Sequence, residues 1–216
     1  MAERVAAVRA RIAAAGGEGR VRLVAVTKGF GPEVVAAAVA AGVEDVGEAY
    51  AQELVAKAAA VDVPRWHFVG RLQANKVRAL AGTVDLWQSV DRPRLVDEVA
   101  RRAPGARVLV QVDVTGEPSK GGCRPAEVPA LVERAADAGL EPQGLMAVGP
   151  LGPPEAARPG FRALVGLADR LGLAERSIGM SGDLEVAVQE GATMVRVGTA
   201  LFGPRPPRAG ASDMGN

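Results

Sequence analysis

Short runs of hydrophobic and β-branched residues alternate with longer alanine-rich segments along the whole chain. Each run is long enough for a strand, and each gap is long enough for the helix that connects two parallel strands. Alternation of this kind is typical of α/β proteins. The pattern predicts strands at 21–26, 43–47, 66–69, 84–88, 108–114, 143–148, 176–180 and 194–197.

The segments between these runs carry helix signals. Several begin at Pro, which suits a first helical turn, and several are followed by Gly, which suits a helix C-terminus. They predict helices at 32–41, 49–60, 73–81, 92–103, 125–138, 159–171 and 183–190, with an additional amphipathic helix at 1–15 before the first strand.

Eight successive strand–helix units predict a closed (β/α)8 TIM barrel, which residues 1–205 form as a single domain. An open doubly wound sheet is the alternative architecture, but no G-x-G-x-x-G motif follows the first strand, where the chain reads Thr27-Lys28-Gly29-Phe30-Gly31. Residues 206–216 are polar and rich in helix breakers, and we expect them to form a disordered tail.

The composition of the chain indicates which kinds of partner and which cellular compartment to expect. The chain of 216 residues is 48% hydrophobic and 24% charged, as folded domains are, and its formal net charge is +1. That balance gives no electrostatic case for binding nucleic acid or an anionic membrane. No uninterrupted apolar run is long enough for a transmembrane helix, and the arginines among residues 1–15 argue against a secretory signal. With one cysteine, an internal disulfide is impossible, and we expect a cytoplasmic protein.

A TIM barrel places its active site in the loops that follow the C-terminal ends of its strands. Lys28 ends the first predicted strand and is expected to direct its amine into the mouth of the barrel. Burial favours a neutral lysine, which is the nucleophile required for a Schiff base with a carbonyl compound. The alternative is a strand-end lysine whose amine reaches solvent.

The loops after the last two strands are where such barrels commonly bind phosphate. Ser181 and Gly182 open a helix, and Gly198 and Thr199 follow the final strand. Backbone N–H groups at a helix start, with small residues beside them, make an anion site. Alternatively, Ser181 only caps its helix and Gly198 only forms a turn.

Arg196 lies inside the last strand, where alternation directs it away from the face occupied by its valine neighbours. A guanidinium in a barrel strand needs partners, because burial of an unpaired charge is costly. Either Arg196 binds a ligand, or it forms a structural ion pair with a core carboxylate such as Glu48.

Other reactive side chains favour structural roles. The single histidine, His67, excludes a histidine-rich metal site and is expected to be a core residue with satisfied ring nitrogens. Cys123 has no histidine near it in the sequence, which argues against a thiol nucleophile. Lys57 and Lys76 are expected on the surface.

Several ordered blocks of the sequence resemble the pyridoxal phosphate homeostasis proteins, whose barrel is similar to the N-terminal domain of alanine racemase. The resemblance spans about residues 3 to 205. The blocks are LVAVTK (23–28), DVGEAYAQEL (45–54), WHFVGRLQANK (66–76), GLMAV (144–148), and the pair GMSGDLEVAV (179–188) and MVRVGTALFG (194–203).

The resemblance implies a fold-type-III barrel that holds pyridoxal 5′-phosphate (PLP) as an aldimine on Lys28. It further implies that Ser181 and the backbone of Gly198 and Thr199 hold the phosphate, with Arg196 near the pyridine nitrogen. An arginine partner favours an unprotonated ring nitrogen and weakens the electron sink that PLP catalysis uses. The implied function is to hold PLP and deliver it to PLP-dependent apoenzymes, with little or no turnover, in a protein that is expected to be a monomer.

Two positions depart from the pattern of the relatives. Ala49 stands where they usually have Asn in a G-E-N-Y block, so an amide contact from that position is lost. Gly29-Phe30-Gly31 stand where many relatives carry a second lysine and a proline, so transfer of PLP through a second lysine is in question.

Two enzyme functions compete with the carrier function. A PLP-dependent amino-acid racemase of this fold type draws a second acid/base tyrosine from an added domain, whereas Tyr50 is the only tyrosine in this chain. A sugar-phosphate enzyme of the same fold needs an acid/base pair, for which Lys28 and Glu48 are the candidates.

Overall fold

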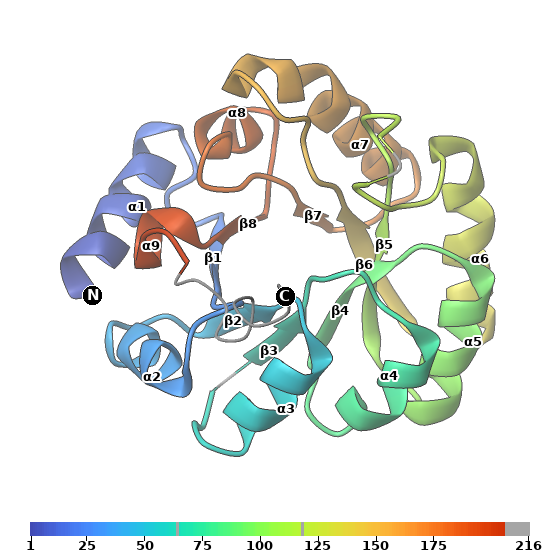
Figure 1. The fold of residues 1–216 in the computed structure, drawn as a ribbon. Helices are drawn as coiled ribbons and strands as arrows, with labels where there is room; N and C mark the ends of the chain where they lie inside the picture. Colours follow the sequence, from blue (N-terminus) through green and yellow to red (C-terminus); the bar gives the residue numbers. More distant parts are fainter. Residues whose placement is uncertain (64, 118, 206–216) are drawn as a thin grey trace, which may run out of the picture.

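The computed structural model describes residues 1–63, 65–117 and 119–205, and its strands form one closed parallel barrel (Figure 1). The strands follow one another around the barrel in chain order, and β1 closes it by pairing with both β2 and β8. The predicted (β/α)8 barrel is therefore confirmed. The strands are β1 Arg22–Val26, β2 Asp45–Glu48, β3 Arg65–Phe68, β4 Leu86–Val90, β5 Arg107–Gln111, β6 Glu141–Met146, β7 Glu175–Ser177 and β8 Met194–Val197.

A ring of helices surrounds the barrel, and α1 is the predicted extra helix before the first strand (Figure 1). No helix in the described ranges is long and apolar enough to cross a membrane. The helices are α1 Ala2–Ala14, α2 Pro32–Ala40, α3 Ala51–Ala58, α4 Ala74–Leu80, α5 Pro93–Arg102, α6 Val128–Asp137, α7 Arg158–Arg170, α8 Leu184–Gln189 and α9 Thr199–Phe202, with short 3-10 helices η1 Pro125–Glu127 and η2 Pro154–Ala157.

Some predicted boundaries were wrong. Strand β4 begins two residues later than predicted, because the Val84 N–H still donates to Leu80 O and closes the turn after α4. Strand β5 ends at Gln111 rather than residue 114, because the chain folds back and the Cys123 N–H bonds Gln111 O. The short helix α9 was not predicted, and the predicted tail at 206–216 lies outside the described residues.

Side-chain alternation along the strands separates two interiors. Outward-facing residues, mostly Val, Leu and Ala, pack against the helices and form the main hydrophobic core. Inward-facing residues fill the barrel itself, where a small apolar cluster of Val24, Leu86, Leu109, Met146 and Met194 is buried. Polar residues share this inner space, and their hydrogen bonds cross it between strands that are not neighbours, as from Ser177 of β7 to Gln88 of β4.

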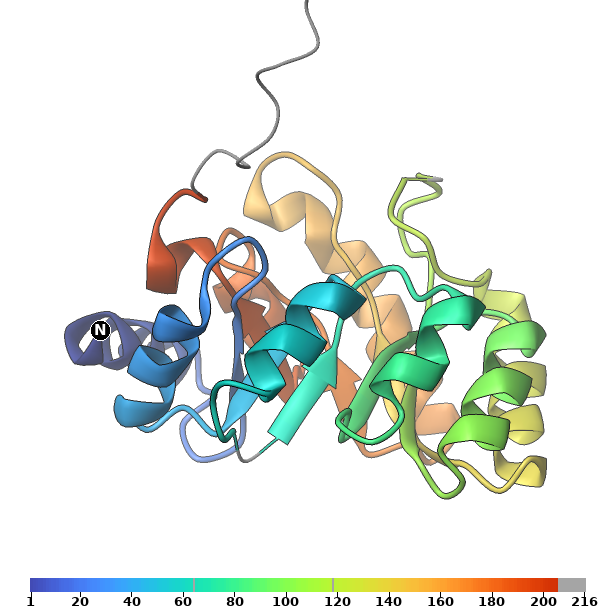
Figure 2. The ribbon, with the colours of Figure 1, turned by 60° about the horizontal axis from the view of Figure 1, so that its bottom comes forward.

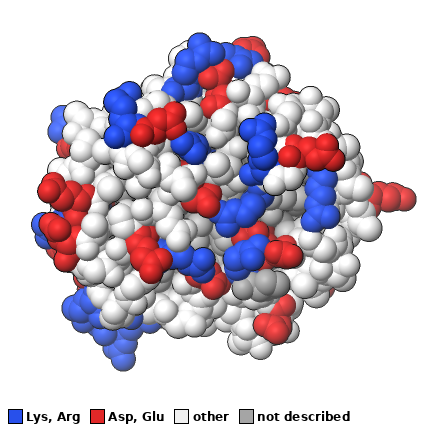
Figure 3. Space-filling model, turned by 180° about the vertical axis from the view of Figure 1, so that it is seen from behind, with Lys and Arg blue, Asp and Glu red and all other residues white. Residues whose placement is uncertain are grey.

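The two ends of the barrel look different. In Figure 2 the strands run upward, and α9 and the loops after β5 and β6 rise above the barrel. The opposite end, which carries the N-terminal ends of the strands, is covered by interleaved positive and negative side chains (Figure 3). Its ion pairs include Arg22–Glu175, Arg65–Asp45, Arg107–Asp85 and Arg176–Asp169.

Candidate functional site

A cavity of about 500 Å³ opens at the C-terminal mouth of the barrel. Apolar side chains form much of its wall, including Val26, Val69, Val148 and Met180. All five residues predicted to form the site line this one cavity: Lys28, Ser181, Arg196, Gly198 and Thr199. The structure therefore brings together Lys28 from the turn after β1, Arg196 from β8, and the loops after β7 and β8.

Lys28 reaches this cavity because of strand alternation. Val24 and Val26 point into the barrel, Thr27 points outward, and Lys28 at the next position points inward over the mouth. Its side chain is half-buried, and no hydrogen bond or ion pair joins its Nζ to any described residue. Burial lowers the pKa of Lys28, and the nearby cations Arg205 and Arg196 lower it further. Lys28 is thus an amine with an enlarged neutral, nucleophilic fraction.

A buried ion pair supports the strand end that carries Lys28. Thr27 Oγ1 donates to Glu48 Oε1 at 2.5 Å, and Lys57 Nζ donates to the same oxygen at 2.5 Å and to Thr27 O at 2.8 Å. Burial raises the pKa of Glu48, while the hydrogen bonds from Lys57 and Thr27 favour its ionised form. Lys57 is only 3% exposed, so the prediction of a surface lysine was wrong. The burial of Lys57 could not be predicted, because the sequence does not show that Glu48 lies close enough to pair with it.

Glu53 fixes the loop that follows Lys28. Its Oε2 accepts hydrogen bonds from the Gly29 N–H at 2.7 Å and from Lys57 Nζ at 3.2 Å. Gly29 has φ of +81°, a left-handed conformation that strains any other residue. The backbone at this turn therefore favours the glycine that follows Lys28.

Arg196 is buried on the inner face of β8, as alternation predicted. Its Nη1 donates to Ser177 O at 2.6 Å and to Ser177 Oγ at 2.7 Å, and its Nη2 donates to Ala147 O at 2.7 Å. Burial lowers the pKa of Arg196 to about 10, while the negative charge of Asp183 opposes this. No carboxylate of a described residue lies within ion-pair distance, and Glu48 pairs with Lys57 instead, so the alternative of an Arg196–Glu48 pair was wrong.

These bonds leave part of the guanidinium available. A guanidinium has five N–H groups, and the bonds to Ser177 and Ala147 use three of them. The Nε–H and one Nη2–H make no hydrogen bond to any described residue, and Arg196 lines the cavity. The residue is therefore held rigidly while it keeps donors for an acceptor in the cavity.

The loops after β7 and β8 form another part of the cavity wall. Ser181 Oγ accepts a hydrogen bond from the Ala200 N–H at 3.2 Å, which joins the loop after β7 to the start of α9. The Thr199 and Gly182 N–H groups have no partner among the described residues. A methyl group on Gly198 would come within 3.1 Å of Val26 O, so a larger residue would crowd this wall. Two small loops thus present backbone donors to one space.

Helix α1 stabilises this wall from outside. Arg11 Nη2 donates to Ser181 O at 3.1 Å, and the same guanidinium forms an ion pair with Glu185. Arg4 Nη1 donates to Leu201 O at 3.2 Å in α9. The extra helix therefore connects the loop after β7 and helix α9 to the rest of the fold.

Sequence reasoning did not assign Arg205 to the site. Arg205 lines the cavity beside the Lys28 loop, and a methyl group on Gly29 would lie 3.3 Å from its Cδ. The sequence offered one indication of this role, since Arg205 is a basic residue close to the end of the last strand and directly before the expected tail.

The histidine and the cysteine have the structural roles that were predicted. His67 Nε2 lies 2.9 Å from Asp45 Oδ1, and its Nδ1 lies 2.7 Å from Gln88 Nε2, so both ring nitrogens are satisfied in the core. Cys123 is a buried free thiol, and burial raises its pKa to about 12. No group of metal-ligating side chains occurs in the described part of the chain.

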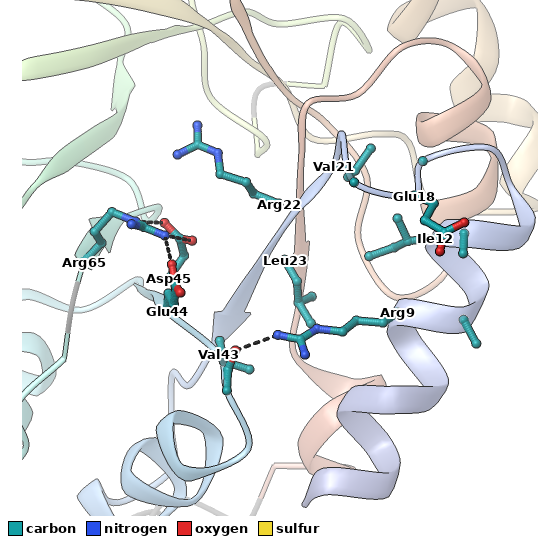
Figure 4. Close-up of a pocket in the computed structure, with 15 residues that line it drawn as sticks. Arg9, Ile12, Glu18, Val21, Arg22, Leu23, Val43, Glu44, Asp45 and Arg65 are labelled. Carbon is teal, nitrogen blue, oxygen red and sulfur yellow. Dashed lines mark hydrogen bonds and ion pairs between the residues drawn. The ribbon is translucent and has the colours of Figure 1, made fainter.

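A second hollow, of about 620 Å³, lies at the other end of the barrel between α1 and the starts of β1 and β2 (Figure 4). Its arginines already have partners within the protein. Arg65 pairs with Glu44 and Asp45, Arg9 donates to Gly42 O, and Arg22 pairs with Glu175. Barrels of this type do not place active sites at this end, so the mouth remains the candidate.

Comparison with known proteins gives a family match over residues 1–206 to the alanine racemase N-terminal domain. The chain is 43% identical to a pyridoxal phosphate homeostasis protein of Pseudomonas aeruginosa, with 98% of this chain and 99% of that protein covered. It is 42% identical to the protein of the same name from Aquifex aeolicus, with 88% and 89% covered.

Solved structures agree with these matches. PipY of Synechococcus elongatus, solved with PLP bound, has a TM-score of 0.79 at 32% identity and covers 94% of this chain and 99% of its own. Alanine racemase of Streptomyces lavendulae has a TM-score of 0.71 at 27% identity, but the match covers 93% of this chain and only 58% of the racemase.

Proposed function

The chain belongs to the alanine racemase N-terminal domain family and, within it, to the pyridoxal phosphate homeostasis proteins, and from this premise we propose that it binds PLP at the C-terminal mouth of its barrel. The observation that carries the proposal is that Lys28, Arg196 and the loops after β7 and β8 line one cavity.

These residues fit the chemistry of PLP. The cofactor has an aldehyde, a phosphate and a pyridine ring with an acceptor nitrogen. Lys28 Nζ is the group suited to the aldehyde, because burial enlarges its neutral fraction. Ser181 and the backbone of Gly198 and Thr199 suit the phosphate, and the Arg196 guanidinium suits the ring nitrogen. Lys28 would hold the cofactor through a Schiff base, in which its nitrogen bonds the aldehyde carbon and water leaves.

The same arrangement favours holding PLP over turning over amino acids. When bound, PLP can act as an electron sink, most strongly with a protonated ring nitrogen. Arg196 retains its proton at neutral pH, since its pKa of about 10 lies well above 7, so it would hold the ring nitrogen through a hydrogen bond and would not protonate it. The chain also matches only 58% of the length of the alanine racemase noted above. A PLP-dependent racemase is therefore the second candidate.

The wider function that we propose is to keep PLP bound and deliver it to PLP-dependent apoenzymes, with little or no catalytic turnover. Residues 1–205 act as a single PLP-binding domain, and the protein works as a monomer in the cytoplasm. The family of the chain and its one cysteine, a free thiol, support this assignment.

Borohydride reduction tests the proposed site, because it converts a Schiff base into a stable adduct. After incubation with PLP and borohydride, peptide mass analysis is expected to find the pyridoxyl group on Lys28. Lys28→Ala is expected to abolish it, whereas Lys76→Ala, a change of a lysine outside the cavity, is expected to leave it intact. An adduct scattered over several lysines, or one that persists in Lys28→Ala, would refute the site.

Turnover separates the carrier from the racemase. Incubation of the PLP-loaded protein with single L-amino acids is expected to yield no D-isomer above the level of free PLP. Conversion that disappears in Lys28→Ala would favour the racemase.

A further inference from the structure

A continuous row of buried polar side chains crosses the interior of the barrel from the mouth to the opposite end. Arg196 bonds Ser177, Ser177 Oγ lies 2.6 Å from Gln88 Oε1, Gln88 Nε2 lies 2.7 Å from His67 Nδ1, and His67 Nε2 lies 2.9 Å from Asp45 Oδ1. We call these five residues the interior chain. Each is buried, and they come from β8, β7, β4, β3 and β2.

The lower end of the interior chain is a carboxylate. Arg65 donates to Asp45 from Nε at 2.7 Å and from Nη2 at 2.9 Å, as Figure 4 shows. Desolvation opposes ionisation, but the hydrogen bonds from Arg65 and His67 outweigh it and hold the pKa of Asp45 well below its usual range. Asp45 is therefore an acceptor, with a fixed negative charge.

The upper end fixes the direction of the hydrogen bonds. Arg196 has only donors, so Ser177 Oγ must accept from it and use its single O–H toward Gln88. Gln88 Oε1 then faces Ser177, which places its Nε2 toward His67 Nδ1. Met194 supports this orientation, because its Sδ accepts from the same Nε2 at 3.1 Å.

The reversed orientation is worse at two points. With the Gln88 amide rotated, Ser177 Oγ would receive two donors and its own hydrogen would lose its acceptor. The amide oxygen would also face the Met194 sulfur. In the favoured orientation His67 Nδ1 must accept, so Nε2 carries the ring proton and donates it to Asp45. All hydrogens in the interior chain then point from the guanidinium toward the carboxylate.

We propose that Ser177, Gln88 and His67 are positioning residues for Arg196, an inference that rests on the proposed function. A carboxylate directly beside Arg196 would occupy the N–H groups that face the cavity. The interior chain instead ends at Asp45, whose charge Arg65 balances, and it orients the Ser177 hydroxyl toward Arg196 through mutually polarised hydrogen bonds. Arg196 is thereby held while its Nε–H and one Nη2–H have no partner among the described residues, and these groups would be available to the ring nitrogen of bound PLP.

The ligand-free protein provides the first test. Because His67 is the only histidine, its imidazole nitrogens give the single histidine pattern in a 15N NMR spectrum. We expect a protonated, pyrrole-type Nε2 and an unprotonated, pyridine-type Nδ1. A proton on Nδ1 would overturn the proposal, whether or not the protein binds PLP.

Ser177→Ala provides the second test, since it removes one hydroxyl and keeps the carbonyl that Arg196 also uses. We expect altered His67 nitrogen signals, although residue 177 does not contact His67, because Gln88 loses the partner that orients it. We expect PLP affinity to fall about three- to tenfold, which is less than for loss of a hydrogen bond between PLP itself and a charged side chain. We also expect a shifted absorption band of bound PLP. Trapping on Lys28 should persist.

Met146→Leu is the matched control, because it changes an apolar side chain of the same interior and is expected to leave the imidazole signals, the affinity and the absorption band unchanged. Unchanged affinity and absorption in Ser177→Ala would overturn the proposal. Absence of PLP binding by the unsubstituted protein would instead refute the proposed function, and the imidazole spectrum would still decide the direction of the interior chain.

Discussion

At the N-terminal end of the barrel, Arg22, Arg65 and Arg107 each lie within ion-pair distance of a carboxylate. At the C-terminal mouth, Lys28 and Arg196 do not, within the described parts of the chain. Positive charges that lack a partner in a partly dry cavity are costly, so a protein keeps them where a ligand will use them. The arginines of the hollow beside α1 are thus used in ion pairs within the protein, whereas the cations of the mouth remain available to a ligand, so the mouth is the candidate site.

Lys57, a buried lysine of α3 beside the ends of β1 and β2, does have a carboxylate partner, and its removal should have the largest effect. Lys57→Met would leave the Glu48 carboxylate buried without its ion-pair partner, and we expect the free energy of unfolding to fall by about 3–5 kcal/mol. Urea denaturation measures this loss. The matched change Lys76→Met should cost far less, and equal losses in the two variants would contradict the role of the Lys57–Glu48 pair.

The pH dependence of that variant has a definite sign. Without Lys57, burial raises the pKa of Glu48 in the folded protein above its value in the unfolded chain, so the folded state binds more protons. The variant's deficit in stability should therefore be smallest at acidic pH and grow as the pH rises through the folded pKa of Glu48. A deficit independent of pH would contradict this account.

Burial and the nearby cations of the mouth should together govern how Lys28 titrates. Burial lowers the pKa of Lys28, followed by the charges of Arg205 and Arg196, so its neutral form should become available below the usual lysine value of about 10.4. The initial rate of PLP uptake should rise with pH and level off below that value. Arg205→Ala removes one cation and should move the midpoint to higher pH, whereas an unchanged or lower midpoint would exclude Arg205 as a cause.

The connection between α1 and the mouth should have a moderate effect. Arg11→Ala removes the bonds to Ser181 O and Glu185, and we expect PLP affinity to fall several-fold, with a loss of stability of at most about 1 kcal/mol. Equilibrium titration with PLP measures the affinity. Arg124→Ala, which removes an exposed ion pair with Glu127 at a residue that does not line the cavity, is the control and should bind PLP normally.

The smallest effect is expected at the N-terminal end. Arg22→Ala removes a half-exposed ion pair with Glu175, which is worth about 0–1 kcal/mol. PLP affinity should not change. A clear loss of affinity would show that this end contributes to the site and would remove the contrast between the two ends.

Much of the fold could be predicted because it depends on local patterns. Runs of hydrophobic and β-branched residues between alanine-rich segments located the strands. The position of Lys28 at the end of the first run placed it at the barrel mouth, and side-chain alternation in the last strand directed Arg196 inward. The ends of β4 and β5 could not be located, since a helix turn at Leu80 and a backbone pairing with Cys123 decide where those strands begin or end.

The sequence by itself determined the barrel, the face that carries the site and five residues that line one cavity there, and the binding roles of those five stay predictions. Only the tertiary structure decided which groups pair: Lys57 with Glu48, and Arg196 with Ser177 rather than with an acid. The physical reason is distance along the chain. Alternation is set by the backbone one residue at a time, whereas a hydrogen bond from β7 to β4 forms only after the closed barrel brings those strands across from each other.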